Sequence, residues 1–328
     1  MKKGRCIMDK DLLNAALIAA RDCMKVQKGE LFLVVTDTDL VEIGESLMEA
    51  GRTLEAEVSM LKILPRSRNG EEPPENVVQA MVHSDVVIAP TAKSLTHTTA
   101  RRNACAAGTR VATMPGILRE TMIRGLNADY YAIAERTKRV TELLNTAKVA
   151  RVTSAAGTDI TLPLEGIDAI ASTGLMHGPG SFGNLPSGES YLMPVEGASE
   201  GVFVVDGSMA GIGDLAGKIP ITIRVEKGHA TEISGGPEAD LLEEKLLPLG
   251  QPARNIAEFG VGTNDAARII GNILEDEKVM GTIHIALGNN MSMGGTVDVP
   301  LHLDGIVKDP TVELDGTVVM KKGKLLIG

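Results

Sequence analysis

The segment "NTAKVARVTSAAGTD", residues 145–159, marks the change in sequence pattern that decides the fold. Before it, apolar runs of strand length alternate with stretches of helical spacing, which is typical of a parallel sheet flanked by helices. From it onward, short alternating runs are separated by turn residues such as Gly157, which is typical of antiparallel hairpins. The change predicts an α/β domain over residues 1–147 and a mostly antiparallel β, or α+β, domain over residues 148–328.

The first domain has four expected strands with helical stretches between them. The strands are residues 32–37, 56–63, 85–90 and 109–116. Ligands of such folds usually bind at the carboxyl edge of the sheet, but no GxGxxG follows the first strand, so a nucleotide site has little support. In the second domain we expect two helices, over residues 237–250 and 263–278.

Composition excludes several classes of partner. The net charge of −10 and the lack of long basic runs oppose binding to nucleic acid. No segment approaches the roughly 20 consecutive apolar residues of a membrane-spanning helix, so we expect no membrane partner. The three cysteines, Cys6, Cys23 and Cys105, lack CxxC or zinc-finger spacing, which indicates reduced thiols and a cytoplasmic protein.

One histidine stands in an apolar strand near the C-terminus, in "GTIHIALGNN", residues 281–290. Period-two alternation places His284 on the less apolar face, opposite the side that carries Ile283 and Ile285. That face is available for water or a ligand. The alternative is a core histidine whose ring bonds to a neighbouring carbonyl group.

Further ligand-type side chains follow the same logic. In "VDVPLHLDGIV", residues 297–307, alternation puts His302 and Asp304 on one face, about 6–7 Å apart along the strand, close enough to reach one cation. Glu189 and Glu258 occupy apolar or glycine-rich surroundings where a solvated charge is not expected. Taken singly, each carboxylate is equally typical of a strand edge, but the combination indicates a metal site.

Four motifs occur in an order that resembles a known family. They are "GNLPSGE", "AEFGVGTN", "DEKVMGTIHIALG" and "HLD". The chain resembles the aminopeptidase T and aminopeptidase S family of metallopeptidases, and also the related non-haem iron enzymes typified by 2,5-dihydroxypyridine 5,6-dioxygenase. The resemblance covers essentially the whole chain and is most specific in the second half.

The peptidase resemblance implies a dinuclear centre of zinc, cobalt or manganese in which a metal-bound water cleaves a small peptide-like substrate. The implied metal ligands are Glu189, Glu258, His284, His302 and Asp304. Either Glu189 or Glu258 would bridge the two ions and act in catalysis. His97, at the start of a helix on the ligand-binding edge of the first domain, is a candidate acid or base. The family resemblance also predicts a homodimer.

Two departures keep other functions open. A peptidase tyrosine seven residues beyond the strand histidine corresponds to Met291, which cannot stabilise an oxyanion. A peptidase ligand glutamate aligns with Glu277 only after a shift of two residues. A mononuclear Fe(II) dioxygenase needs only two histidines and one carboxylate, which His284, His302 and Asp304 supply by type. A metal-binding relative with weak or no catalysis is the third possibility.

Overall fold

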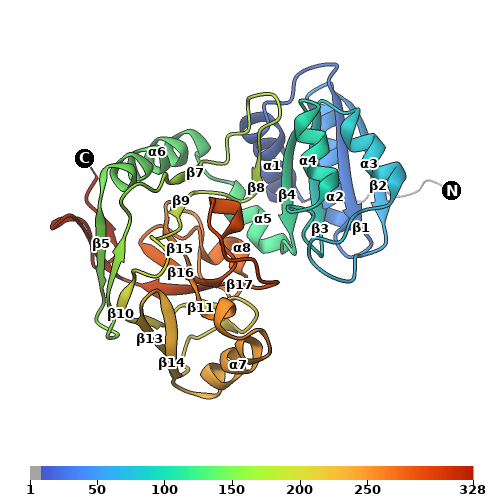
Figure 1. Ribbon diagram of the computed structural model, residues 1–328. Coiled ribbons are helices and arrows are strands. Elements are labelled where there is room, and N and C mark those ends of the chain that lie inside the picture. The colour runs from blue at the N-terminus through green and yellow to red at the C-terminus, as the bar shows by residue number, and fades with distance from the viewer. Residues whose placement is uncertain (1–8, 328) are drawn as a thin grey trace. The chain divides into compact units, whose positions relative to one another are not determined.

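The computed structural model describes residues 9–327, which divide into two compact units (Figure 1). Unit 1 contains the chain up to Ala132 together with residues 174–187, and unit 2 contains residues 133–173 and the chain from Gly188 onward. These limits differ from the predicted division at residue 147, because most of the helix before that point packs with unit 2. A later segment also returns to unit 1 as a fifth strand. The assignment of the two parts as separate domains stays a prediction.

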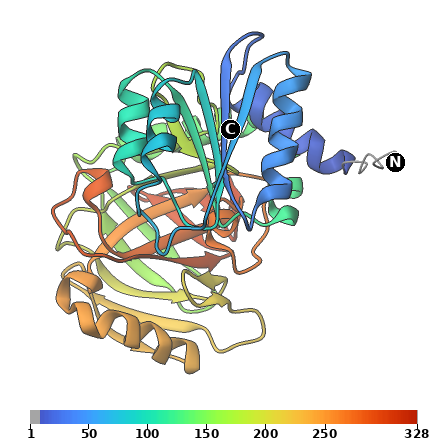
Figure 2. The ribbon, with the colours of Figure 1, turned by 90° about the vertical axis from the view of Figure 1, so that its right-hand side faces the viewer.

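Unit 1 is a parallel sheet with helices on both faces, as the alternating pattern predicts (Figure 2). The strand order is β2-β1-β3-β4-β8, and every pair is parallel. The strands are β1 (Leu31–Asp37), β2 (Glu57–Ile63), β3 (Val86–Thr91), β4 (Arg110–Pro115) and β8 (Phe182–Asn184). The helices are α1 (Lys10–Leu17), the π-helix η1 (Ile18–Cys23), α2 (Val41–Thr53), α3 (Glu75–Val82), α4 (Thr99–Ala106) and α5 (Arg119–Leu126). β3 is buried along its whole length, which a sheet covered on both faces requires.

Unit 2 contains two antiparallel sheets. The eight-stranded sheet has the order β14-β13-β10-β6-β5-β18-β19-β20, and the seven-stranded sheet has the order β12-β11-β17-β16-β15-β9-β7. The strands of the first are β5 (Val149–Thr153), β6 (Asp159–Pro163), β10 (Glu200–Val205), β13 (Ile221–Glu226), β14 (His229–Ser234), β18 (Thr311–Leu314), β19 (Thr317–Lys321) and β20 (Lys324–Leu325). Those of the second are β7 (Ile170–Ser172), β9 (Glu189–Leu192), β11 (Ser208–Met209), β12 (Gly213–Asp214), β15 (Ile256–Gly262), β16 (Thr282–Gly288) and β17 (His302–Lys308). The predicted fold class is therefore confirmed.

The helices of unit 2 lie outside its two sheets. They are α6 (Tyr130–Thr146), whose first turn belongs to unit 1, α7 (Pro237–Leu246), α8 (Ile273–Asp276), and the 3-10 turns η2 (Leu247–Leu249), η3 (Gln251–Arg254) and η4 (Met291–Met293). Inward side chains of both sheets and of α7 form one apolar core, including Val152, Phe203, Leu242, Phe259 and Ile285. The core fixes which face of the seven-stranded sheet is left for other side chains.

Turn chemistry sets the hairpins of unit 2. The β18–β19 turn uses Asp315 and Gly316 with φ of +48° and +81°, and the β13–β14 turn uses Lys227 and Gly228 with φ of +50° and +70°. Two consecutive residues with positive φ match the right-handed twist of the flanking strands, so such turns close tight hairpins.

The helix predicted over residues 263–278 is wrong for most of its length, because only the single turn α8 is helical. Side-chain carboxylates take backbone N–H groups that a helix would use: Glu275 accepts from Arg268 at 3.0 Å, and Asp276 accepts from Ile270 at 2.8 Å. Such side-chain bonds compete with helical hydrogen bonds. The segment therefore forms an irregular connection that leads into β16.

Two remaining predictions concern the chain as a whole. Within residues 9–327, no helix combines the length and the apolar character needed to cross a membrane. Cys23 and Cys105 are both free thiols, whereas Cys6 lies outside the described residues. The cytoplasmic location stays a prediction.

Candidate metal centre

Four neighbouring strands of the seven-stranded sheet carry the five predicted ligands. β9, β15, β16 and β17 are adjacent, with Glu258 opposite Ala286 and Ala286 opposite Asp304. Directly opposed residues of an antiparallel pair share one face. The other three predicted ligands lie on the same face: Glu189, His284 and His302. The face is turned away from the apolar core, where Phe259 and Ile285 pack, as the period-two reading of β16 predicts.

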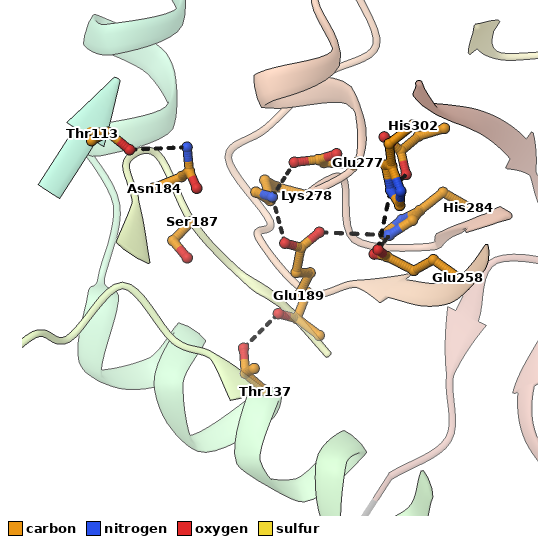
Figure 3. Close-up of polar contacts among 12 residues, drawn as sticks. Thr113, Thr137, Asn184, Ser187, Glu189, Glu258, Glu277, Lys278, His284 and His302 are labelled. Carbon is orange, nitrogen blue, oxygen red and sulfur yellow. Dashed lines mark hydrogen bonds and ion pairs between the residues drawn. The ribbon is translucent and has the colours of Figure 1, made fainter. Parts of the chain in front are cut away.

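The Glu258 carboxylate contacts both imidazoles (Figure 3). Its Oε1 is 3.1 Å from His284 Nε2, and its Oε2 is 3.3 Å from His302 Nε2. His302 Nε2 is also 3.4 Å from Asp304 Oδ1. Glu258, His302 and Asp304 offer ligand atoms that all lie within 4.8 Å of one another, a spacing suited to a single cation.

Gly260 makes room for the His284 ring. The two residues are paired across β15 and β16, and a Cβ atom built on Gly260 would lie 2.0 Å from His284 Nε2. No side chain other than hydrogen fits there without displacing the ring. The His284 imidazole is completely buried, so the ring can occupy its position only because Gly260 has no side chain.

The second nitrogen of His302 has a fixed partner. His302 Nδ1 is 2.7 Å from the carbonyl oxygen of Asn289, so Nδ1 carries the proton and donates it. In the neutral ring, Nε2 then carries the free lone pair, which faces the carboxylates. Metal-binding histidines are held by this kind of outer hydrogen bond. His302 is also the exposed member of the group, with one-third of its side chain accessible.

Three buried polar atoms in the cluster have no hydrogen-bond partner among residues 9–327. They are Glu189 Oε2, His284 Nδ1 and Asp304 Oδ1. Two of them are carboxylate oxygens, which need a proton donor or a cation when they are ionised and buried. The donor set and these unsatisfied oxygens fit a divalent cation. His284 Nδ1 differs from His302 in having no outer partner.

The carboxylates and imidazoles shift one another's pKa. Burial favours neutral Glu258, but hydrogen bonds from His284 and His302 outweigh it and lower the pKa of Glu258 to about 2. Burial likewise favours neutral His284, but the bond to Glu258 and the charge of Glu189 raise its pKa to about 9. The pKa of His302 is raised by Asp304 and Glu258 in spite of burial. Without a metal, both imidazoles are therefore protonated at neutral pH, and a cation that binds Nε2 must displace those protons.

Sequence reasoning missed Lys278, because "EDEK" resembles a charged helix end. The Lys278 side chain is only 2% exposed, and its Nζ lies 2.5 Å from Glu189 Oε1 and also contacts Glu277 Oε1. Burial raises the pKa of Glu277 to about 8 and raises that of Glu189, although the Lys278 charge opposes both shifts. The signal available in the sequence was a lysine placed four residues before the apolar strand that carries His284.

The predicted residues therefore separate into three groups. His284, His302, Asp304 and Glu258 converge, whereas Glu189 faces Lys278 and approaches the group only through His284 Nε2, at 3.7 Å. His97 lies in unit 1, exposed and directly before Thr98, which caps α4. Its catalytic role stays a prediction, as do the individual metal-binding roles.

Comparisons with known proteins identify relatives over the whole chain. A family model described as 2,5-dihydroxypyridine 5,6-dioxygenase matches residues 13–327. The curated 2,5-dihydroxypyridine 5,6-dioxygenase of Pseudomonas putida is 29% identical over 202 residues, which is 56% of each chain, so this alignment spans little more than half of that relative.

Two solved structures share the fold. The 2,5-dihydroxypyridine dioxygenase of Pseudomonas putida superposes with a TM-score of 0.83 at 22% identity, covering 96% of this chain and 97% of the other. AmpT (aminopeptidase T) of Thermus thermophilus gives 0.68 at 18% identity, covering 97% and 99%. The resemblance to both groups is thus confirmed. The comparisons support an enzyme, and they support the dioxygenase alternative better than the predicted hydrolase.

Proposed function

The chain belongs to the 2,5-dihydroxypyridine 5,6-dioxygenase family, and from this premise we propose that it is a non-haem Fe(II) dioxygenase that opens a dihydroxylated aromatic ring with O2. The observation that carries the proposal is the convergence of two imidazoles and two carboxylates on one face of the seven-stranded sheet. The proposed substrate class is 2,5-dihydroxypyridine and similar dihydroxylated rings.

We assign the iron ligands to His284, His302 and Asp304, a set of two histidines and one carboxylate. This set is typical of non-haem Fe(II) oxygenases, which keep coordination positions open. When bound, Fe(II) would supply the redox chemistry that lets O2 react with an electron-rich ring. The protein's contribution is to hold both Nε2 atoms toward the Glu258 carboxylate, by the Asn289 carbonyl for His302 and by the space at Gly260 for His284.

Glu258 is proposed as the proton acceptor of the site. It hydrogen-bonds both imidazoles, and those bonds keep it ionised. When the Nε2 protons leave, the two carboxylate oxygens lose their donors and become free to accept a proton from a substrate hydroxyl group. The same burial that excludes water strengthens this hydrogen bond.

The hydrolase reading requires five ligands and two ions. It is weakened by Lys278, which already neutralises Glu189, and by the half-exposed Met291 at the position of the peptidase tyrosine. The second candidate function is therefore peptide hydrolysis by a pair of zinc, cobalt or manganese ions. The presence of Glu189 on the same sheet face favours it. The expected homodimer stays a prediction that light scattering tests.

Oxygen uptake tests the proposal directly. Metal-free protein loaded anaerobically with Fe(II) is mixed with 2,5-dihydroxypyridine, and we expect one O2 consumed per ring without an added reductant. The D304N variant should lose this activity, whereas H83A, which removes an exposed histidine of unit 1, should retain it. Hydrolysis of leucyl-peptides with Zn(II), Co(II) or Mn(II), together with no oxygen uptake under Fe(II), contradicts the proposal.

His97 is the one proposed catalytic residue outside unit 2. The H97A variant should lower kcat by about 100-fold, the lower end of what general acid–base catalysis contributes. Its metal content should equal that of the wild type, because no proposed ligand lies in unit 1. Unchanged kcat in H97A would leave the residue as an ordinary helix-start histidine.

A further inference from the structure

Lys278 is a buried cation beside the proposed iron site. It lies between α8 and β16, and only 2% of its side chain is exposed. Its Nζ lies between carboxylate oxygens of Glu189 and Glu277 (Figure 3). A charged side chain is rarely buried to this degree unless it is paired.

The two carboxylates hold the ammonium group between them. The Nζ to Glu189 Oε1 distance of 2.5 Å is that of a short, charge-assisted hydrogen bond, so the lysine charge lies directly against the carboxylate. The other oxygen of Glu189 has no hydrogen bond and lies 3.7 Å from His284 Nε2. Without Lys278, the buried carboxylates of Glu189 and Glu277 would therefore face each other with no cation between them.

We propose that Lys278 is a built-in cation that occupies a second metal position and so restricts the centre to one divalent ion. The inference rests on the proposed mononuclear Fe(II) site and names the residue that makes it mononuclear. Removing the charge should open a site for a second divalent ion, held by Glu189 and Glu277. Lys278 acts here as a positioning residue, because it reaches the iron ligands only through Glu189.

Metal stoichiometry tests the proposal without any assay of activity. Metal-free wild-type protein, K278M and K278R are dialysed against excess Mn(II), and bound metal is determined by elemental analysis. We expect one ion per chain for wild type and K278R, and two for K278M. The K138M variant, which removes an exposed lysine of α6, is the matched control and should bind one. One ion per chain in folded K278M overturns the inference, as do two ions in the wild type.

A second variant keeps the test decisive if K278M does not fold. In E189Q the lysine remains, so one Mn(II) should still bind, with an affinity within about threefold of the wild type. Loss of the ion in E189Q would assign Glu189 to the metal and overturn the inference. The double variant K278M/E189Q should return from two ions to one. Failure of the Fe(II) proposal is separate: one ion per chain without oxygen uptake contradicts the function but not the role of Lys278.

Discussion

Two buried glutamates on the same sheet face are neutralised in different ways. Glu258 and Glu189 are 8% and 5% exposed, yet the pKa of Glu258 is lowered to about 2 while that of Glu189 is raised. Glu258 accepts hydrogen bonds from two imidazoles, whereas Glu189 faces the ammonium group of Lys278. We call these the imidazole end and the lysine end of the cluster.

The two ends differ in whether the positive charge beside the glutamate can be removed. An imidazole can release its Nε2 proton when a cation competes for that nitrogen, and it then offers a lone pair to the metal, so the imidazole end can exchange protons for a cation. Lys278 has its pKa raised further by Glu189 and Glu277 in spite of burial, so its charge is permanent. One end is therefore built for an exchangeable cation and the other for a fixed one.

The largest effect is expected from removing an imidazole. H302A deletes a proposed ligand whose Nε2 faces both Glu258 and Asp304. Loss of an outer-shell partner typically costs 10–100-fold in metal affinity, so loss of a ligand should cost more than about 100-fold. Titration with Fe(II) under anaerobic conditions measures the affinity, and H83A serves as the histidine control. An affinity within tenfold of the wild type would remove His302 from the ligand set.

A smaller effect is expected from filling the space beside His284. In G260A the new Cβ meets His284 Nε2 at 2.0 Å, so the ring or the strand must move. We expect a loss of about 1–3 kcal/mol in the free energy of unfolding, as for other overpacked cores. Metal affinity should fall by about 10–100-fold, because the ligand is displaced but still present.

The control for this prediction is another glycine. Gly178 has ordinary φ and no atom within 4 Å of a Cβ built on it, so G178A should change neither quantity. Denaturant unfolding of the metal-free proteins gives the first quantity and Fe(II) titration gives the second. If the Fe(II) affinity of G260A equals that of the wild type, the His284 ring does not need the space that the glycine provides.

The sequence predicted the imidazole end better than the lysine end, for a physical reason. Alternation along a single strand is local, so His302 and Asp304 could be placed on one face without knowing any partner strand. Their approach to His284 and Glu258 depends on strand register, which the resemblance supplied and the residues alone did not. The parallel sheet of unit 1 and the hairpins of unit 2 were predictable from periodicity and turn residues for the same local reason.

The lysine end depends on contacts between distant segments. Lys278 and Glu189 are 89 positions apart, and the segment before Lys278 has helical spacing although it is mostly irregular. Side-chain carboxylates of Glu275 and Asp276 capture its backbone N–H groups, a competition that no periodicity reveals. For the same reason, the division at residue 147 did not anticipate the return of β8 to the first sheet.

The third prediction uses pH to separate the two ends. In metal-free protein, the raised pKa of His284 contributes stability that is complete below about pH 6.5 and is lost as pH rises through about 9. The lowered pKa of Glu258 contributes stability that is complete above about pH 4.5 and is lost as pH falls through about 2. Bound metal should reverse the alkaline slope, because protons then compete with the cation for Nε2.

Denaturant unfolding at several pH values, with and without Mn(II), measures both slopes. The E258Q variant should lose the part of the His284 contribution that comes from Glu258, so the loss of stability near pH 9 should be smaller than in the wild type. Glu277, with its pKa raised to about 8, adds a separate loss of stability as pH rises from 4.5 to 8, and that loss should remain in E258Q. If the free energy of unfolding changes with pH in the same way with and without metal, the cation does not replace the imidazole protons.

The smallest effect is expected from the loop that supports the imidazole end. Asn289, whose carbonyl holds His302 Nδ1, is followed by Asn290, which donates to Glu196 at 2.8 Å. Glu196 also accepts from the backbone N–H and hydroxyl group of Thr296, both at 2.7 Å, and these bonds lower its pKa.

In E196Q the loop loses part of this ionic hydrogen bonding, at a cost of about 1 kcal/mol. Because only the outer partner of one ligand is loosened, Fe(II) affinity should fall by about fivefold, measured by the same titration. E200Q, at an exposed glutamate that also accepts a backbone N–H, is the control and should leave the affinity unchanged. A fall in E196Q equal to that in H302A would mean that the loop supplies a ligand itself, whereas no change would mean that β17 alone orients the imidazole.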